Sequence, residues 1–298
     1  MSDFRLKVFQ SVAKNLSFTK ASQELFVSQP AITKHIQELE AAYQTRLFDR
    51  QGSRISLTDS GKLLLEHCER ILEDYKRLEY EMHLLHNEYT GGLKLGASTT
   101  IAQYVLPPLL ASFIGKFPQV NLSLLNGNSR EIEAALQEHR IDLGFVEGVF
   151  RLPNIKYTTF LEDELVAVVL TGSRLTVGEE ITPEELLHLP LVLRERGSGT
   201  LDVFERALQQ HNIKLSSLQV LMYLGSTESI KLFLEHTDCL GIVSIRSITR
   251  ELYSGQLRVV EIKGMPMLRD FSFAQPQGQE SGLAQVFMQF AMHNNNKL

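Results

Sequence analysis

Tryptophan, cysteine and long apolar runs are the scarce features of this 298-residue sequence. It has no Trp and two cysteines, Cys68 and Cys239, which excludes a disulfide-stapled secreted domain and a zinc site built from four cysteines. No run of about 18 apolar residues occurs, and the first residues lack a basic stretch followed by an apolar core. We therefore expect no membrane-spanning helix, no secretory signal, and a chain that works in the reducing cytoplasm.

Charge is unevenly distributed along the chain. The first sixty residues carry eight Lys and Arg against six Asp and Glu, a net charge of +2, and the remainder carries −7. A basic end on an acidic body suits a polyanion-binding module attached to something else. An excess this small arises often by chance, so charge alone does not identify the partner. The length favours two domains, with three as the alternative.

Helical periodicity and turn residues near the N-terminus predict a helix-turn-helix. Apolar residues at four-residue steps define one face of a first helix: Phe4, Val8, Val12 and Leu16. Ser17 is a suitable N-cap for a second short helix over residues 19–25. Ser28 offers a cap hydroxyl to a third helix, and Pro30 lies in its first turn, where a missing N–H does no harm. A short helix, a tight turn and a capped helix with a polar outer face are typical of this DNA-binding motif.

The outer face of the third helix and a basic hairpin after it supply candidate DNA contacts. Gly52 marks a turn between two short extended pieces, which predicts a β-wing with basic residues near its tip. Gln, Thr and Lys side chains read base edges or contact phosphates, and arginines of a wing reach phosphate or the minor groove. The alternative is an ordinary solvated surface. The candidate DNA-binding residues are Ser28, Gln29, Pro30, Thr33, Lys34, Arg50 and Arg54.

A heptad pattern follows the hairpin, beginning after the suitable cap residue Thr58. Apolar side chains recur at alternating steps of four and three: Leu64, Cys68, Ile71, Tyr75, Leu78, Met82, Leu85 and Tyr89. A single amphipathic helix explains two heptads, but about four favour a coiled coil with the same helix of a second subunit. Cys68 is interpreted as one of these seam residues rather than as a redox sensor. Gly91 and Gly92 are expected to end the helix and to act as a hinge.

Short apolar strands alternate with helical segments through the rest of the chain. The pattern predicts strands at residues 93–97, 120–124 and 142–146, separated by helices. The same alternation of strands and helices repeats between residues 165 and 244. Such alternation predicts parallel sheets with crossover helices. The expected fold class is therefore α/β, with an N-terminal all-α winged helix-turn-helix, a long linker helix and two small α/β lobes. Ligands of such sheets bind outside the carboxyl ends of the strands.

Hydroxyl-rich segments stand where strands end and helices begin. Ser98–Thr100 does so in the first lobe and Gly197–Thr200 in the second, and free N–H groups with the helix dipole favour an anion there. Two such helix starts facing one cleft would suit a carboxylate, a sulfate-like or a phosphate-bearing ligand. The alternative is ordinary capping, which fully explains Ser129 and Thr227. The candidate effector-binding residues are Ser98, Thr99, Thr100, Ser129, Arg196, Ser198, Gly199, Thr200 and Thr227.

Spaced motifs cover the first sixty residues: Ser17–Leu25, Val27–Thr33, Ile36, Leu39-Glu40, Leu47–Arg50, Leu57-Thr58 and Gly61. These motifs resemble the N-terminal module of LysR-type transcriptional regulators. Two departures are Ser22, where the family often has Ala, and Tyr43-Gln44, where it usually has Leu-Gly. The segment Leu193–Thr200 looks like the LREPGSGT segment of the subgroup that regulates sulfur assimilation and carbon fixation, with Arg196 in place of Pro.

The resemblance covers essentially the whole chain and implies three parts. These are a winged helix-turn-helix at 1–58, a linker and dimerisation helix at 59–90, and an effector domain at 91–298. The effector domain has two lobes, one formed by 91–161 with 266–298 and the other by 162–265. Both lobes are similar to those of periplasmic binding proteins. The family implies a homodimer through the linker helix, commonly a homotetramer, on double-stranded DNA with an interrupted inverted repeat. A small effector between the lobes, expected here to be anionic, would control transcription. RNA polymerase is a further candidate partner.

Two other functional classes remain open. One is a cytoplasmic solute-binding protein without regulatory DNA binding, and the other is a hydrolase using Ser198, which would need a base within reach. Enzyme motifs are lacking, because Glu195 stands where a nucleophile elbow needs Gly and Asp202 where a dinucleotide fingerprint needs its third Gly. The histidines show no metal-ligand spacing. We expect no enzymatic activity, no cofactor and no metal.

Overall fold

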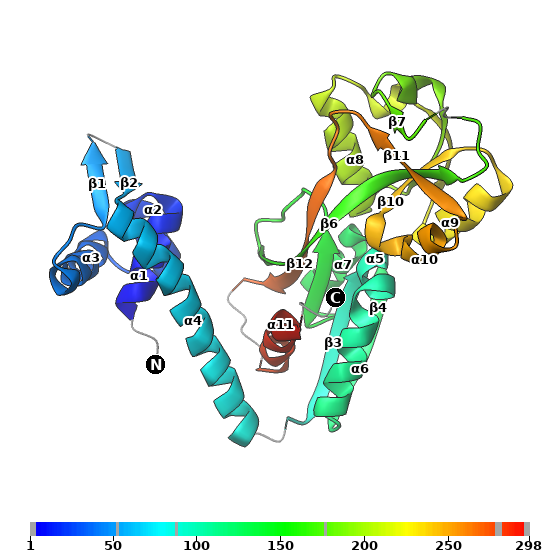
Figure 1. Ribbon diagram of the computed structural model, residues 1–298. Coiled ribbons are helices and arrows are strands. Elements are labelled where there is room, and N and C mark those ends of the chain that lie inside the picture. The colour runs from blue at the N-terminus through cyan, green and yellow to red at the C-terminus, as the bar shows by residue number, and fades with distance from the viewer. Residues whose placement is uncertain (1–3, 52–53, 87–88, 176–177, 278–281, 295–298) are drawn as a thin grey trace. The chain divides into compact units, whose positions relative to one another are not determined.

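The computed structural model describes residues 4–51, 54–86, 89–175, 178–277 and 282–294 (Figure 1). The chain divides into two compact units, Met1–Asn87 and Glu88–Leu298, each with its own hydrophobic core. None of the helices in the described part of the chain combines the length and the apolar character that crossing a lipid bilayer requires.

Three short helices, a hairpin and a long helix make up the first unit. They are α1 (Phe4–Asn15), α2 (Phe18–Leu25), α3 (Gln29–Tyr43), β1 (Phe48–Gln51), β2 (Arg54–Leu57) and α4 (Asp59–His86). The expected cap at Ser17 is confirmed, because its Oγ accepts a hydrogen bond from the Lys20 N–H at 3.2 Å. Pro30 lies in the first turn of α3 as expected, but Ser28 holds the N-cap position without a side-chain cap hydrogen bond. Thr58 Oγ1 accepts from the Gly61 N–H at 3.0 Å and caps α4.

The first turns of α4 close the core of the first unit. Cys68 is fully buried, and its Sγ donates to the Leu6 carbonyl at 3.3 Å. Burial raises the pKa of this thiol to about 11. The interpretation of Cys68 as a seam residue is therefore wrong: it packs against α1, because heptad spacing and the ordinary helical period coincide over two turns. Ile71 and Leu78, by contrast, are 40% and 52% exposed.

The end of α4 differs from the expected helix stop. Gly91 and Gly92 do not terminate it; they open the first strand of the second unit. Tyr89 is not a seam residue either, because its ring packs edge-on against Phe117 in that unit, with 5.5 Å between centroids. The side chains of Met82 and Leu85 lie outside the described residues.

A mixed sheet runs through the second unit. Its strands are β3 (Gly91–Ser98), β4 (Val120–Gly127), β5 (Leu143–Glu147), β6 (Ile155–Leu170), β7 (Glu180–Ile181), β8 (Pro190–Arg194), β9 (Gln219–Leu224), β10 (Leu240–Ser244), β11 (Leu257–Ile262) and β12 (Leu268–Pro276). The order is β4-β3-β5-β12-β6-β10-β8-β9, with β11 pairing β6 and β7. The neighbours β4-β3-β5 and β10-β8-β9 are parallel, as the strand–helix alternation predicts.

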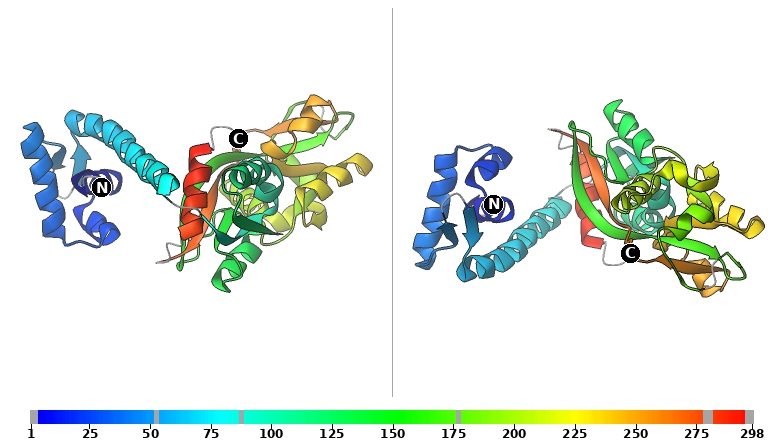
Figure 2. Two further views of the ribbon diagram at one scale, coloured as in Figure 1. Left: turned by 90° about the horizontal axis from the view of Figure 1, so that it is seen from below. Right: turned by 90° about the horizontal axis from the view of Figure 1, so that it is seen from above.

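The helices of the second unit follow its strands and cover the sheet. They are α5 (Thr99–Tyr104), α6 (Leu106–Lys116), α7 (Ser129–Gln137), α8 (Gly199–Gln210), α9 (Thr227–His236), α10 (Thr249–Tyr253) and α11 (Gly282–Asn294), with short 3₁₀ turns at Glu185–His188, Leu215–Ser217 and Ile245–Ser247. Helix α11, red in Figures 1 and 2, packs on α6 through the rings of Phe113, Phe287 and Phe290. The last helix therefore packs with the part of the second unit that contains strands β3, β4 and β5.

Strand β6 belongs to both halves of the sheet. Its residues 155–164 pair with β12, and residues 165–170 pair with β10 and β11 (Figure 1). The return passage lies between the end of β11 at Ile262 and the start of β12 at Leu268. The two halves therefore share the long strand β6, while among the described strands β12 pairs only with β5 and with residues 155–164 of β6.

Candidate functional site

The outer face of α3 carries the candidate DNA-binding residues. Its apolar stripe is buried in the core of the first unit, which turns the opposite stripe outward. Ser28, Gln29, Pro30 and Lys34 are exposed, and Thr33 is half-buried. The Gln29 side-chain oxygen accepts from Thr19 Oγ1 at 3.4 Å, and Lys34 Nζ lies 4.0 Å from Glu38 Oε1. Both contacts are long, so these side chains can reorient toward a partner at little cost.

The hairpin matches the expected wing in its backbone. Strands β1 and β2 are antiparallel, and Gln51 pairs with Arg54. Arg50 lies in β1. The side chains of Arg50 and Arg54 are outside the described residues, so their role in DNA binding stays a prediction.

A buried carboxylate holds the hydroxyl groups that sequence reasoning assigned to an anion. Glu147, the last residue of β5, is 4% exposed. It accepts a hydrogen bond from Ser98 Oγ at 2.6 Å and longer ones from Thr100 at 3.4 Å and Thr200 at 3.5 Å. The two helix starts therefore do face each other, as expected, but the chain itself supplies the negative charge between them. An external anion at this point requires Glu147 to move.

Arg269 neutralises this carboxylate from β12. Its side chain is 1% exposed, and Nη1 lies 3.2 Å from Glu147 Oε1 and donates to Thr200 Oγ1 at 3.0 Å. Its Nε donates to Asp163 Oδ2 on β6 at 2.7 Å. Charges so deeply buried persist only when paired, so the Glu147–Arg269–Asp163 chain ties β5, β12 and β6 together.

Arg194 is a second buried cation, at the end of β8, with a 1% exposed side chain. Its Nη2 donates to Thr99 Oγ1 and to the Gly225 carbonyl, both at 3.3 Å, and its Nε donates to Glu195 at 2.9 Å. Its Nη1 has no hydrogen-bond partner among the described residues. Arg194 therefore joins the start of α5 to the turn before α9 and retains an unused donor.

The remaining candidate effector residues have structural roles in this conformation. Ser129 does not cap α7, because Asn128 accepts from the Glu131 N–H at 3.0 Å while Ser129 Oγ donates to the Glu147 carbonyl at 2.8 Å. Ser198 caps α8 through the Leu201 N–H. Within the described contacts no base reaches Ser198 Oγ.

Three other candidates differ in their surroundings. Gly199 packs so closely on β5 that a Cβ there would lie 2.3 Å from the Glu147 carbonyl oxygen, and this excludes any side chain. Arg196 is exposed beside it. Thr227 is buried at the start of α9, where Ser226 provides the cap.

Sequence reasoning missed Glu147, Arg194 and Arg269, which carry most of the charge in this region. Arg194 stood within the segment compared with the family, directly after an apolar strand, and Glu147 likewise ends one. A charged residue at the carboxyl end of a buried strand was the available signal. Arg269 had no such signal, since only the pairing of β6 with β12 brings it to Asp163.

Polar contacts around Glu228 join helix α5 to helix α9. The Tyr104 hydroxyl donates to Glu228 Oε1, and Lys231 Nζ lies 2.7 Å from Glu228 and 2.7 Å from Glu251. Burial, reinforced by the acceptor Glu228, raises the pKa of Tyr104. Burial opposes ionisation of Glu228, but the hydrogen bonds from Lys231 and Tyr104 outweigh it and lower the pKa of this carboxyl. Glu228 thus stays ionised and holds the two helices together.

The described residues contain no group of three or more His, Cys, Asp or Glu side chains placed to hold a metal ion. The region instead contains hydroxyl groups, two buried arginines and helix N-termini. These groups donate hydrogen bonds and carry positive charge, which suits a small anion.

Comparisons with known proteins agree with both units. A family profile described as "Bacterial regulatory helix-turn-helix protein, lysR family" matches residues 4–62, and one described as "LysR substrate binding domain" matches residues 86–295. The HTH-type transcriptional regulator YeiE of Escherichia coli K12 is 35% identical over 258 residues, which are 87% of this chain and 85% of that protein.

Two solved structures share the fold. The CcmR regulatory domain of Synechocystis PCC6803, in complex with 2-PG, is 27% identical with a TM-score of 0.62, and the match covers 68% of this chain and 97% of that one. CrgA, a LysR-type transcriptional regulator from Neisseria meningitidis, is 19% identical with a TM-score of 0.69, and the match covers 99% of each chain.

Proposed function

Because this chain belongs to the LysR family of bacterial transcriptional regulators, we propose that it binds an interrupted inverted repeat as a dimer, under control of a small anion held near Arg194. DNA binding and a two-lobed effector domain are properties of the family to which it belongs. The operator geometry, the oligomer and the residues of each site are our proposal. A solute-binding protein without DNA binding is disfavoured, because residues 4–62 match the regulatory helix-turn-helix family.

The exposed stripe of α3 supports the DNA-binding half of the proposal. Gln29 and Lys34 lie on that stripe with long, weak contacts, so neither side chain has to be released from a strong partner. Gln can pair with a base edge in the major groove and Lys with a phosphate. We assign base reading to Gln29 and Thr33, and phosphate contact to Lys34 and the wing residues Arg50 and Arg54.

Lys34→Ala tests this assignment against Lys14→Ala, a matched change at an exposed lysine of α1 that pairs with Glu69. Operator duplexes selected from a random pool with the unmodified protein serve as probes in gel-shift titrations at several salt concentrations. We expect Lys34→Ala to weaken binding to all selected sequences and to reduce the salt slope by about 1. An unchanged affinity and slope, equal to those of Lys14→Ala, would contradict the proposed contact.

The unused donor of Arg194 is the observation that carries the effector half. A buried guanidinium N–H without an acceptor is costly and calls for one. Thr99, at the start of α5, and Gly225, before α9, already bind the same guanidinium, so an anion there would touch both halves of the second unit. The CcmR domain is in complex with 2-PG, and we propose a ligand of the same small anionic class here.

Thermal-shift titration of the full chain with sulfate, phosphate and 2-PG tests the effector site. We expect at least one of these anions to raise Tm of the unmodified protein and to lose this effect in Arg194→Lys, which keeps the charge but loses Nη1. Arg140→Lys, an exposed arginine paired with Glu138, is the matched control. An equal anion effect in all three proteins would place the anion elsewhere.

The exposed Ile71 and Leu78 of α4 support dimerisation through that helix. We propose a homodimer, and a homotetramer on DNA, with RNA polymerase as a partner and the cytoplasm as the place of action. The relatives are transcriptional regulators, and we propose that this chain likewise catalyses no reaction.

A further inference from the structure

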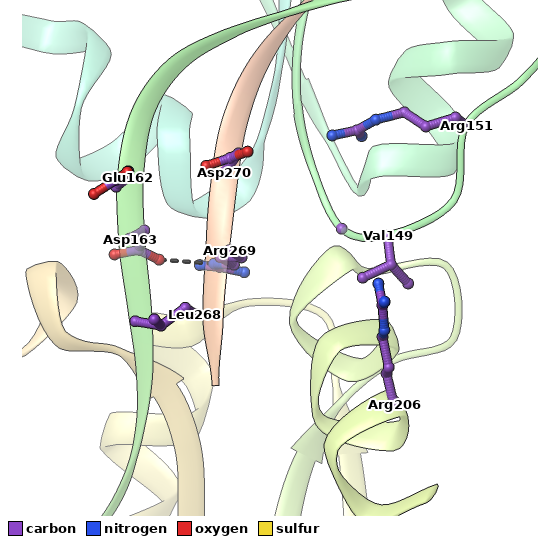
Figure 3. Close-up of a pocket in the computed structure, with 9 residues that line it drawn as sticks. Val149, Arg151, Glu162, Asp163, Arg206, Leu268, Arg269 and Asp270 are labelled. Carbon is purple, nitrogen blue, oxygen red and sulfur yellow. Dashed lines mark hydrogen bonds and ion pairs between the residues drawn. The ribbon is translucent and has the colours of Figure 1, made fainter. Parts of the chain in front are cut away.

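A cavity of about 370 Å³ opens on the second unit (Figure 3). Its volume falls within the range of small-molecule pockets, about 300 to 1,000 Å³. Ser98, Thr100, Thr200 and Arg194 do not line it, so it is distinct from the anion site proposed above. We call it the crossover pocket, because strands β6 and β12 form one of its walls.

The two walls of the crossover pocket carry opposite charges. Arg151, in the loop after β5, and Arg206, on α8, lie on one side, while Glu162 of β6 and Asp270 of β12 lie on the other (Figure 3). Arg206 and Glu162 are exposed, and neither side chain has a hydrogen-bond or ion-pair partner among the described residues. Asp270 has one long contact, from Thr159 at 3.4 Å. Unpaired charges of both signs thus face one cavity.

A buried pair forms the floor between these walls. Asp163 and Arg269 bind each other at 2.7 Å, and both are almost fully buried. Arg269 also pairs with Glu147, and Asp163 lies 3.7 Å from Arg246 Nε, so this buried group carries no unpaired charge. Figure 3 shows Arg269 on β12 with its contact to Asp163 on β6 as a dashed line. The exposed residues of the two walls are therefore the groups left to hold a ligand.

We infer that the crossover pocket binds a small zwitterion, a molecule with a carboxylate at one end and an ammonium group at the other. The carboxylate accepts from Arg206, and the ammonium donates to Glu162 and Asp270. Val149 and Leu268 provide apolar contact for the carbon chain between these groups. A simple anion would leave the acidic wall unpaired and repelled, and a simple amine would do the same to the basic wall. The ligand would touch both halves of the second unit and favour one arrangement of them.

Calorimetric titration of the full chain tests this inference. The probes are γ-aminobutyrate and the common L-amino acids at millimolar concentration, with butyrate and butylamine as single-charge analogues. We expect saturable binding of at least one zwitterion and binding at least about tenfold weaker for both analogues. If no zwitterion binds, or if butyrate binds as tightly as the zwitterions, the inference is wrong.

Two substitutions at exposed residues locate the binding. Arg206→Ala and Glu162→Gln each should weaken zwitterion binding about tenfold, since each removes one charge-assisted contact. Arg140→Ala and Glu184→Gln, at exposed positions outside the cavity, are the matched controls and should change nothing. Arg194→Lys should abolish the anion effect and leave zwitterion binding intact. Zwitterion binding that is lost in Arg194→Lys but kept in Arg206→Ala would overturn the inference, because the ligand would then occupy the anion site.

Discussion

The two units of this regulator present their functional side chains in opposite ways. On α3 of the first unit the candidate DNA-binding residues are exposed and weakly held. In the second unit the polar residues at the helix starts are buried, and most of them already bind Glu147, Arg269 or Arg194. A surface for a large polyanion can be preformed in water, whereas a site for a small ion must exclude water and satisfy its own buried charges. We therefore propose that the second unit exchanges internal partners when an anion binds.

The largest effect should come from breaking the internal pairing. Arg269→Ala leaves Glu147 buried without a cation and Asp163 with only the longer contact to Arg246, and we expect it to lower the free energy of unfolding by about 3–5 kcal/mol. Urea unfolding of the full chain measures this change. Lys34→Ala, at an exposed residue of the first unit, is the control and should stay within about 0.5 kcal/mol of the unmodified protein. Equal stability of the two variants would contradict the view that the second unit depends on its buried ion pairs more than the first unit depends on its exposed residues.

A second prediction concerns the exposed face of α3 in the first unit. Gln29→Ala should lose about 1–3 kcal/mol of discrimination at one operator position, with no change in stability, because a base contact is removed from a surface residue. Binding titrations with singly substituted operator duplexes report the discrimination. Gln37→Ala lies farther along the same helix and should preserve it. Discrimination that survives in Gln29→Ala would remove this residue from the base-reading surface.

A third prediction concerns competition between Glu147 and an external anion. Glu147→Gln keeps an oxygen acceptor for Ser98 but removes the negative charge between the two helix starts. We expect sulfate to bind about tenfold more tightly to this variant, because like-charge repulsion disappears. Isothermal titration with sulfate is the measurement, and Glu138→Gln, an exposed carboxylate, is the control. Weaker sulfate binding in Glu147→Gln would show that the carboxylate assists the anion instead of competing with it.

The smallest expected effect lies at the end of α3. Gln44 adopts φ 51° at the position where the family usually has Gly. Gln44→Gly should therefore raise the stability of the first unit by about 1 kcal/mol, since an L side chain in the left-handed region is strained. Gln37→Gly, within the same helix, should have the opposite sign and a similar size. Thermal unfolding of both variants checks the pair, and a destabilised Gln44→Gly would refute the strain.

Local signals predicted the helices and strands well. Ser17, Pro30 and Thr58 marked helix starts because capping involves only neighbouring residues. The same rules failed where two adjacent residues offered the same chemistry: either Asn128 or Ser129 could cap α7, and the structure uses Asn128. They failed again at Cys68, because heptad periodicity does not say which of two surfaces will cover a helix face.

The order of the elements, the α/β class and the polar outer face of α3 can be predicted from the sequence, since each depends on residues a few positions apart. The partner of each buried charge follows from the three-dimensional fold instead. Arg269 reaches Asp163, which is 106 residues away along the chain, and Ser98 reaches Glu147 at a separation of 49 residues. Hydrogen bonds and ion pairs act over a few ångströms in space, and folding alone sets which distant residues come within that range.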